Sequence, residues 1–213
     1  MEKFLKWWKK YSFVLLIVFV LAGIIDMRLA TAAVICMTAP IIVSVFNGRF
    51  WCGNLCPRGN FYDNAVSKFS NKRKVPDYLK SGCFRFVFTV LVLWVFGLGI
   101  KNNWGNIYGI GMVFYRIIVL STLAGILLSL LYNHRTWCHF CPMGSIASFI
   151  SRISIEKKVL HVSSDCTSCK ICEKKCSLGI VPYEYKGDLL SHPDCIQCGK
   201  CAAACPKKAI RYN

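Results

Sequence analysis

Long apolar stretches separated by short polar segments dominate the first 133 residues of the chain. Four of these stretches approach the roughly 20 residues that a helix needs to cross a hydrocarbon core about 30 Å thick. They cover residues 11–25, 29–46, 84–100 and 112–132. The first is the shortest, and a cleaved signal segment is its alternative, but no small-residue processing motif precedes Asp26 and Arg28. The pattern therefore predicts a membrane α-helical protein with four transmembrane helices, all of them retained.

Lys and Arg are concentrated on one side of these four stretches. Residues 1–10 contain four of them and residues 47–83 contain seven, whereas the two opposite turns contain only Arg28 and Lys101. Because positively charged loops stay in the cytoplasm, we expect a multi-pass protein of the cytoplasmic (inner) membrane with both termini in the cytoplasm. The same topology, with membrane lipid as the neighbour, accounts for the net charge of +17. A nucleic-acid partner is therefore not expected.

Eight of the 14 cysteines form two consecutive runs near the C-terminus, each with the spacing Cys-x2-Cys-x2-Cys-x3-Cys. In such runs the first three cysteines bind one 4Fe-4S cluster and the fourth binds the neighbouring cluster. A zinc module or a disulfide framework is the alternative, but zinc sites place two ligands close together and two far away, and a reducing cytoplasm disfavours disulfides. The sequence therefore predicts an electron-transfer protein. The expected ligands are Cys166, Cys169, Cys172 and Cys205 for cluster 1, and Cys195, Cys198, Cys201 and Cys176 for cluster 2.

The sequence Asn-x-Arg-x-Trp-Cys occurs twice, at residues 47–52 and 133–138, and a Cys-Pro pair follows each copy. The repeat predicts a duplicated helical hairpin. Proline fits the first turn of a helix, so Cys56 and Cys141 should begin helices, where the helix dipole would lower their pKa. The helices that follow are expected to be amphipathic and to lie along the membrane surface. Their apolar positions are Phe61, Ala65 and Phe69 in the first copy and Ile146, Phe149, Ile150 and Ile153 in the second.

The repeated loops together contain enough cysteines for one more cluster. We hypothesise that Cys52, Cys56, Cys138 and Cys141 bind a third 4Fe-4S cluster at the membrane boundary. Three alternatives stay open: a pair of dithiol switches, a metal such as copper, and simple packing at helix ends. Haem is not expected, because it needs axial histidines inside the membrane and none of the four histidines lies in the middle of a predicted span.

With these motifs, the chain resembles the NapH/NosR-type membrane-bound polyferredoxins. The resemblance implies a four-helix membrane domain over residues 1–160, built as two repeated hairpins with cytoplasmic Cys-Pro loops. It also implies a C-terminal cytoplasmic domain over residues 161–213, a small α+β ferredoxin of the bacterial two-cluster type. The first loop matches the family's Cys-x3-Cys-Pro motif at Cys52 and Cys56, whereas the second is one residue shorter between Cys138 and Cys141.

The function that the resemblance implies is that of an electron-transfer subunit of an oxidoreductase complex, with no catalytic residue of its own. Electrons would pass between a cytoplasmic donor or the quinol pool and a membrane or extracytoplasmic partner, sometimes through a flavin-bearing subunit. The basic side chains of the cluster domain are suited to attract an acidic soluble donor such as a ferredoxin, flavodoxin or flavoprotein. Quinone or another membrane subunit would complete the path. Two further hypotheses are a copper-reducing maturation factor and an iron-sulfur redox sensor.

Overall fold

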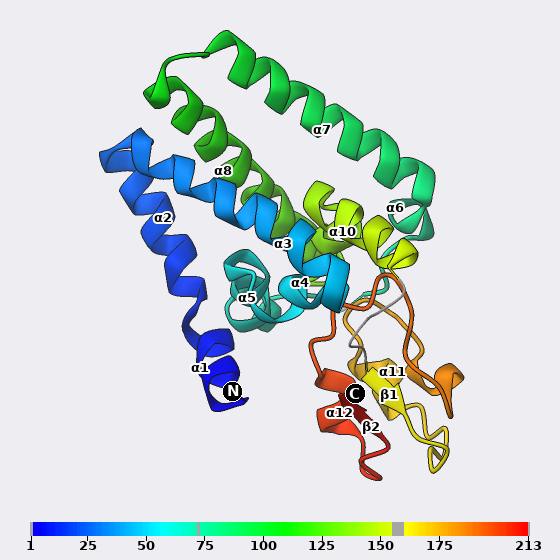
Figure 1. Ribbon diagram of the computed structural model, residues 1–213. Helices are drawn as coiled ribbons and strands as arrows, with labels where there is room; N and C mark the ends of the chain where they lie inside the picture. The colour runs from blue at the N-terminus through cyan, green and yellow to red at the C-terminus, as the bar shows by residue number, and fades with distance from the viewer. Residues whose placement is uncertain (1, 72, 155–159, 213) are drawn as a thin grey trace.

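The computed structural model describes residues 2–71, 73–154 and 160–212 as a set of long helices with a small α+β part at one end (Figure 1). The chain begins with α1 (Glu2–Tyr11) and α2 (Phe13–Ile25), which are bent by 42° relative to each other. At the bend, the buried hydroxyl of Ser12 accepts a hydrogen bond of 2.7 Å from Asn60 Nδ2. With 13 residues, α2 alone is too short to cross a bilayer. The predicted first span is therefore one half of a bent helix pair.

Three other helical segments are long and apolar enough to cross a membrane. A 3-10 segment, η1 (Met27–Ala32), continues into α3 (Ala33–Asn47), and α7 (Gly82–Asn102) and α8 (Ile107–Leu131) follow later in the chain. The described residues thus contain three candidate spans, or four if the bent pair of α1 and α2 counts as one.

The surface of these long helices is rich in apolar side chains. Phe86 and Trp94 of α7, for example, are 70% and 66% exposed, as expected for helices that face lipid. The fourth predicted span begins earlier than its apolar pattern suggested, at Ile107 and not at Met112. Asn106 causes the early start, because its side chain accepts hydrogen bonds from the first backbone amides of α8.

Short helices fill the two segments that hold the repeated cysteine motifs. Between α3 and α7 these are α4 (Phe50–Asn54), α5 (Pro57–Asn64), η2 (Val66–Lys68) and α6 (Asp77–Lys80). After α8 they are α9 (Trp137–Phe140) and α10 (Pro142–Ile153). In Figure 1 they lie between the long helices and the α+β part.

Only one of the two helices predicted to be amphipathic has that pattern, and its placement along the membrane surface stays a prediction. In α10, Phe149 and Ile153 are exposed while Ala147 is buried, as the apolar pattern indicated. The prediction for the first copy is wrong, because α5 ends at Asn64 and Phe69 lies beyond it. Protein surrounds α5: the ring of Tyr62 is fully buried, and its hydroxyl donates to a backbone carbonyl of α8.

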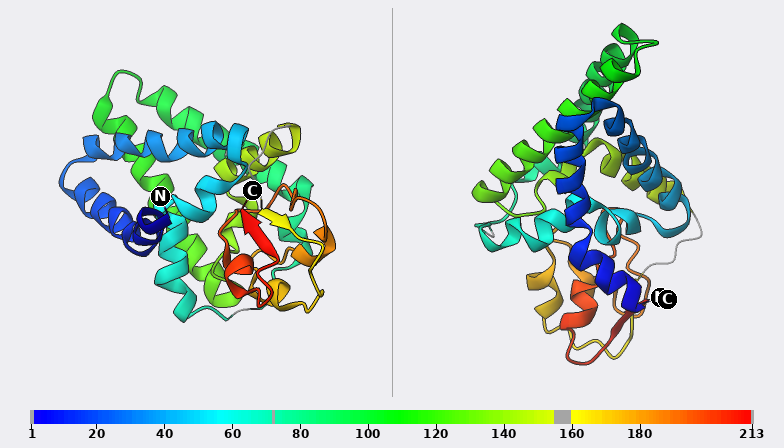
Figure 2. Two further views of the ribbon diagram at one scale, coloured as in Figure 1. Left: turned by 60° about the horizontal axis from the view of Figure 1, so that its bottom comes forward. Right: turned by 90° about the vertical axis from the view of Figure 1, so that its left-hand side faces the viewer.

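The C-terminal part has a small antiparallel sheet that joins its two ends. Strand β1 (Leu160–Val162) pairs with β2 (Ile210–Tyr212), with Leu160 opposite Tyr212. Between the strands lie α11 (Ile171–Lys175), η3 (Pro182–Tyr185) and α12 (Lys200–Ala204). Figure 1 and the right-hand view of Figure 2 both place the N- and C-termini at the end of the molecule opposite the connection between α7 and α8. The two ends of the chain therefore lie at the same end of the molecule, and their cytoplasmic placement stays a prediction.

Candidate iron-sulfur sites

Two cavities in the α+β part are lined by the eight cysteines of the tandem runs. The empty space in them, including the part open to solvent, is about 350 Å³ and about 380 Å³. Each run supplies three cysteines to one cavity and its fourth cysteine to the other, which is the partition that the spacing predicted. Ligation of a cluster by each set stays a prediction. Cys166, Cys169, Cys172 and Cys205 line the first cavity, and Cys176, Cys195, Cys198 and Cys201 line the second.

The backbone adopts the same unusual conformation in both runs. Ser168 and Lys170 flank the second cysteine of the first run with φ of 52° and 61°, and Gln197 and Gly199 flank its counterpart with φ of 50° and 76°. Positive φ is costly for residues that carry a Cβ. Three of these four positions therefore hold strain, and the strain recurs where each loop turns around its cavity.

The chemistry of both cavities fits an iron-sulfur cluster. Burial raises the pKa of the Cys195 and Cys201 thiols to about 12, so these thiols stay protonated at neutral pH until a metal displaces the proton. Apolar side chains such as Ile171 and Ile196 complete the walls. Four sulfur donors in an apolar pocket are the ligand set and the surroundings that a 4Fe-4S cluster requires.

The four loop cysteines belong to the short helices beside the α+β part. Cys56 and Cys141 are the N-caps of α5 and α10, each followed by proline in the first turn, as predicted. Cys52 lies in α4 and Cys138 in α9. Among the residues that the structure describes, no three His, Cys, Asp or Glu side chains lie close enough to hold a single metal ion.

Burial controls the protonation of the first-copy thiols. It raises the pKa of Cys52 to about 12, and the nearby thiols of Cys56, Cys138 and Cys141 add to this effect. Burial also raises the pKa of Cys56, although the Gly59 amide donates to its sulfur at 3.4 Å. The predicted lowering of the Cys56 pKa by the helix start is therefore wrong for the free thiol, because loss of water outweighs the dipole.

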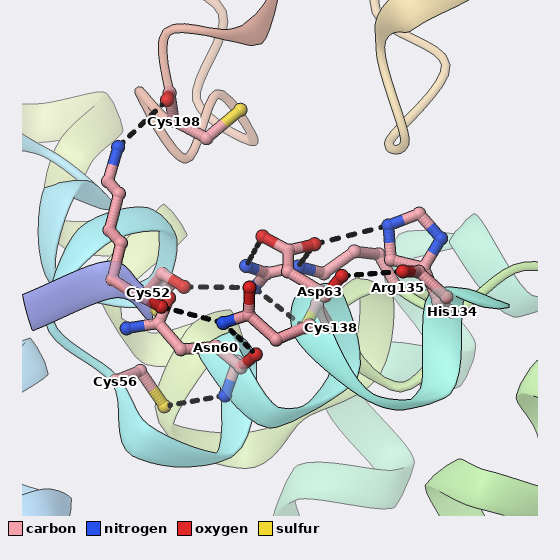
Figure 3. Close-up of polar contacts among 12 residues, drawn as sticks. Cys52, Cys56, Asn60, Asp63, His134, Arg135, Cys138 and Cys198 are labelled. Atoms are coloured by element: carbon pink, nitrogen blue, oxygen red, sulfur yellow. Dashed lines mark hydrogen bonds and ion pairs between the residues drawn. The ribbon is translucent and has the colours of Figure 1, made fainter. Parts of the chain in front are cut away.

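The two loops hold each other through their repeated arginines. Arg49 of the first copy donates from Nη2 to the carbonyl oxygen of Cys138 at 2.7 Å. In return, Arg135 of the second copy donates from Nη1 to the carbonyl oxygen of Cys52 at 2.9 Å (Figure 3). Both arginines are almost completely buried. The Arg of each Asn-x-Arg-x-Trp-Cys element thus positions the cysteine-bearing backbone of the other copy.

A glycine in each loop makes room for the arginine of the other loop. A Cβ on Gly144 would lie 2.6 Å from Arg49 Nη2, and one on Gly59 would lie 2.7 Å from Arg135 Nη1. These glycines end the sequence Cys-Pro-x-Gly, which occurs in both copies. The repeated motif therefore encodes a packing requirement as well as the position of its cysteine.

One partly buried carboxylate joins the membrane helices to the α+β part. Asp194, which precedes Cys195, accepts hydrogen bonds from Arg49 Nη1 at 3.1 Å, Arg85 Nη1 at 2.9 Å and Ser148 Oγ at 2.9 Å. Burial alone would raise the pKa of Asp194, but the bond from Arg85 and the charge of Arg49 hold it well below its usual range. Asp194 is therefore charged at neutral pH and neutralises part of the buried positive charge.

Asp63 has the corresponding role for the second arginine. Its two carboxylate oxygens accept hydrogen bonds from Arg135 at 3.1 and 2.7 Å (Figure 3). Lys200 of α12 also donates to this carboxylate at 2.8 Å. His134 Nε2 lies 3.1 Å from the same carboxylate. Burial opposes ionisation, but the Arg135 charge and the bond from His134 hold the pKa of Asp63 well below its usual range.

The loop around the second cavity sits directly against α4. Asn54 of α4 donates from Nδ2 to the carbonyl oxygen of Gln197 at 3.1 Å. Gly53 is buried there, and a Cβ on it would overlap the carbonyl oxygen of Ile196. Because Cys52 precedes Gly53 in the same helix, the second cavity is the one that lies next to the loop cysteines.

The two carboxylates and Arg85 were not predicted from the sequence as parts of the site. The sequence does contain an indication of the two carboxylates, because acidic residues are scarce: the chain has only 10 of them against 27 basic residues. An aspartate inside a strongly basic loop, or directly before a cysteine run, is therefore a candidate counter-ion. The partners, however, are 72 residues away for Asp63 and Arg135 and 145 residues away for Asp194 and Arg49, and spacing alone cannot pair them.

Comparisons with known proteins match both parts of the chain. A family described as a 4Fe-4S binding domain matches residues 29–76 and 115–159, and a family described as a 4Fe-4S dicluster domain matches residues 165–210. The chain is also 26% identical over 199 residues to the ferredoxin-type protein NapH of Haemophilus influenzae, which covers 82% of this chain and 67% of the relative. The chain is thus similar to NapH over most of its length and carries two matches to 4Fe-4S domains.

Two uncharacterized proteins of Methanocaldococcus jannaschii are similar over comparable lengths. One is 28% identical over 192 residues, which covers 85% of this chain and 71% of the relative. The other is 26% identical over 210 residues, which covers 92% and 82%. No solved structure matches the chain. Together with the apolar helices, these matches support an iron-sulfur electron-transfer protein that is similar to NapH, in agreement with the resemblance seen in the sequence.

Proposed function

We propose that this NapH-like chain relays electrons at the cytoplasmic membrane through three 4Fe-4S clusters. The path would connect a cytoplasmic donor or the quinol pool with a membrane or extracytoplasmic redox partner. One contact carries the proposal: the loop around the second cavity, which contains Ile196 and Gln197, packs against α4. This contact brings the second cysteine-lined cavity next to Cys52. Bound in these sites, a 4Fe-4S cluster supplies one-electron transfer without proton or bond chemistry in the chain itself.

The proposed ligands are three sets of four cysteines. The two cavities of the α+β part provide the first two sets. For the third set, the family described as a 4Fe-4S binding domain matches both repeated loops, and the reciprocal bonds of Arg49 and Arg135 hold those loops together. The third set consists of Cys52, Cys56, Cys138 and Cys141.

The order of the three sites follows from their positions in the fold. The second cavity adjoins α4, whereas the first contains Cys169, whose side chain is exposed. An electron from a soluble carrier would therefore enter at the first cavity and reach the loop cysteines through the second. Lys174, Lys175, Lys207 and Lys208 lie in the same part of the chain and suit an acidic donor such as a ferredoxin, flavodoxin or flavoprotein.

The proposed topology places the α+β part in the cytoplasm. The basic residues of α1 and of the segment between α3 and α7 support this side, as does the position of both termini at one end of the molecule (Figure 2). We propose two repeated hairpins as the membrane domain, over residues 1–160, and the ferredoxin domain over residues 161–213. Strand β1 begins at Leu160 and belongs with the second domain.

The acceptor that suits this arrangement is quinone, another membrane subunit or a flavin-bearing partner that meets the chain near the loop cysteines. We propose no haem, because the electron path uses cysteine-bound sites throughout. The copper-reducing and redox-sensor hypotheses stay open, and no contact among the described residues specifically favours either of them.

Counting iron tests the third site. Anaerobically purified wild-type protein should contain about twelve irons per chain, and the double variant Cys56→Ser and Cys141→Ser should contain about eight, because one four-iron cluster is lost. The measurement is iron and acid-labile sulfide per chain, with the visible and electron paramagnetic resonance spectra.

The matched control removes two cysteines that lie outside all three sets. Cys36 and Cys83 are exposed, so the double variant Cys36→Ser and Cys83→Ser should keep the wild-type iron content. A wild-type content of about eight irons, unchanged in the Cys56 and Cys141 variant, would sink the third site and leave the two ferredoxin sites standing.

A further inference from the structure

Arg58 is a cation that crosses from one cysteine loop to the other. It follows the Cys-Pro pair of the first copy, whereas the second copy has Met143 at the equivalent position. Its Nη2 donates to the sulfur of Cys141 at 3.2 Å, and its Nη1 donates to Ser121 Oγ of α8 at 2.8 Å. These two bonds fix the guanidinium group against one of the four proposed ligands of the third site.

The surroundings of this guanidinium provide little screening by water. Its central carbon lies 5.6 Å from the centre of the Trp137 ring, and that side chain is 7% exposed. Ser121 belongs to a candidate membrane span. A charge held between an aromatic ring and a membrane helix acts through a lower dielectric constant than a charge on the protein surface.

Arg58 differs from the other three arginines of the site, Arg49, Arg85 and Arg135, in having no carboxylate partner among the described residues. Arg49 is paired with Asp194, and Arg135 is paired with Asp63. Within the described residues, Arg58 forms no ion pair with a carboxylate, and its hydrogen bonds go to a thiol and a hydroxyl. Arg49, Arg85, Arg135 and Lys200 share two carboxylates, so the region beside the loop cysteines has a surplus of positive charge, and within the described residues Arg58 is the arginine there that no carboxylate pairs with.

The cations beside the two ferredoxin sites donate to no cysteine sulfur among the described residues: Lys9 donates to the carbonyl oxygen of Cys198 beside the second cavity and is partly exposed. Lys207 lines the first cavity, but its side chain is exposed, so solvent ions screen it. Lys200 lines the second cavity, but it is paired with Asp63. Adding an electron adds negative charge to a cluster, and hydrogen bonds to its sulfurs and nearby positive charge favour that reduced form. Guanidinium groups donate to two sulfurs of the loop site, Arg58 to Cys141 and Arg135 to Cys138, so we expect its reduced form to be the most stabilised of the three.

We propose that Arg58 sets the reduction potential of the third cluster above the potentials of the two ferredoxin clusters, and so directs electrons toward the membrane. This inference rests on the third cluster proposed above. A reduced one-electron carrier of the ferredoxin or flavodoxin class supplies the electron. The electron passes through the two ferredoxin clusters and reduces the third cluster at the loop site. Each step moves one electron, and no bond forms or breaks.

The experiment is a redox titration of the full chain in lipid nanodiscs, followed by electron paramagnetic resonance. The signal of the third cluster is identified as the one that the Cys56→Ser and Cys141→Ser variant lacks. Its midpoint potential should be the highest of the three in wild-type protein. In Arg58→Met, which makes the two loops alike, and in Arg58→Gln, this potential should fall while the other two do not change.

Two further variants separate charge from general damage to the loop. Arg58→Lys keeps the positive charge, and its third-cluster potential should stay near the wild-type value. Met143→Leu alters the equivalent position of the other loop without changing charge, and it should leave all three potentials unchanged. The iron content of each variant is measured in parallel.

The inference fails if Arg58→Gln contains about twelve irons and keeps the wild-type potential of the third cluster. It also fails if both neutral variants lose four irons while Arg58→Lys keeps them, since Arg58 would then be needed for assembly and not for the potential. A wild-type protein with about eight irons is a different result, because it removes the third cluster itself and with it the proposed function.

Discussion

Replacing Gly53 by Ala is expected to slow electron transfer between the ferredoxin sites and the loop cysteines by about tenfold or more, since small misplacements of reacting groups have effects of this size. A Cβ at this position overlaps the carbonyl oxygen of Ile196. The obstacle is backbone and not a flexible side chain, so the loop around the second cavity must move away from α4. The measurement is the rate at which a reduced ferredoxin passes electrons through the chain to a quinone analogue.

Gly97→Ala is the matched control for this substitution. Gly97 lies in α7, and a Cβ there meets no atom within 4 Å, so the control variant should transfer electrons at the wild-type rate. Both variants should keep the wild-type iron content, because neither position is a ligand. A Gly53→Ala protein with full iron content and an unchanged rate would show that electrons do not cross at this contact.

The cysteine spacing predicted the partition of the ferredoxin ligands because the constraint is local. Within each run, three cysteines lie on one turn of loop and short helix, and the fourth follows past that helix. Antiparallel pairing of β1 with β2 then holds the two ends of the α+β part together. Cys205, near β2, therefore lies at the cavity that the first run lines. The apolar stretches predicted the long helices for a similar reason, since length and composition are enough to identify a candidate span.

The features that sequence reasoning missed depend on contacts between distant segments. The bend at Ser12 is fixed by Asn60, 48 residues further along the chain. The short length of α5 follows from its enclosure by protein, which apolar spacing around Phe69 did not indicate. The expected effect of the helix start on Cys56 was outweighed by burial, which depends on how the two loops pack together. In each case tertiary packing overrode a correct local tendency.

Hydrogen bonds and ion pairs join the two proposed domains in the described structure. Asp194 and Lys200 of the α+β part are bound to arginine and aspartate side chains from the membrane part. Lys9 of α1 also donates to the carbonyl oxygen of Cys198 at 3.0 Å. These bonds join the region around the second cavity to α1, α5 and α7. A fixed arrangement suits electron transfer, because the distance between neighbouring clusters is then constant during turnover.

The stability of this connection should depend strongly on Asp194. The Asp194→Asn variant removes the negative charge that two buried or nearly buried arginines share, Arg49 and Arg85. Breaking a buried ion pair by removing one partner costs about 3–5 kcal/mol, because the remaining charge is left uncompensated. We expect the temperature at which the purified protein loses its iron-sulfur absorbance to fall by many degrees relative to wild type.

The loss of thermal stability in Asp194→Asn should arise because Asp194 is largely shielded from water. Asp77→Asn, at an exposed aspartate, is the control. Asp77 is paired with Lys80, but its side chain is fully exposed, and exposed ion pairs contribute little because water and salt screen them. Asp77→Asn should therefore lose its absorbance at the wild-type temperature.

Because the pKa of Asp194 is depressed, its contribution to stability is present above the ordinary aspartate pKa of about 4 and is lost only as the pH falls below it. The difference between the two variants should accordingly be the same at pH 6 and pH 8, and equal thermal stabilities at both would mean that Arg49 and Arg85 are neutralised by other groups.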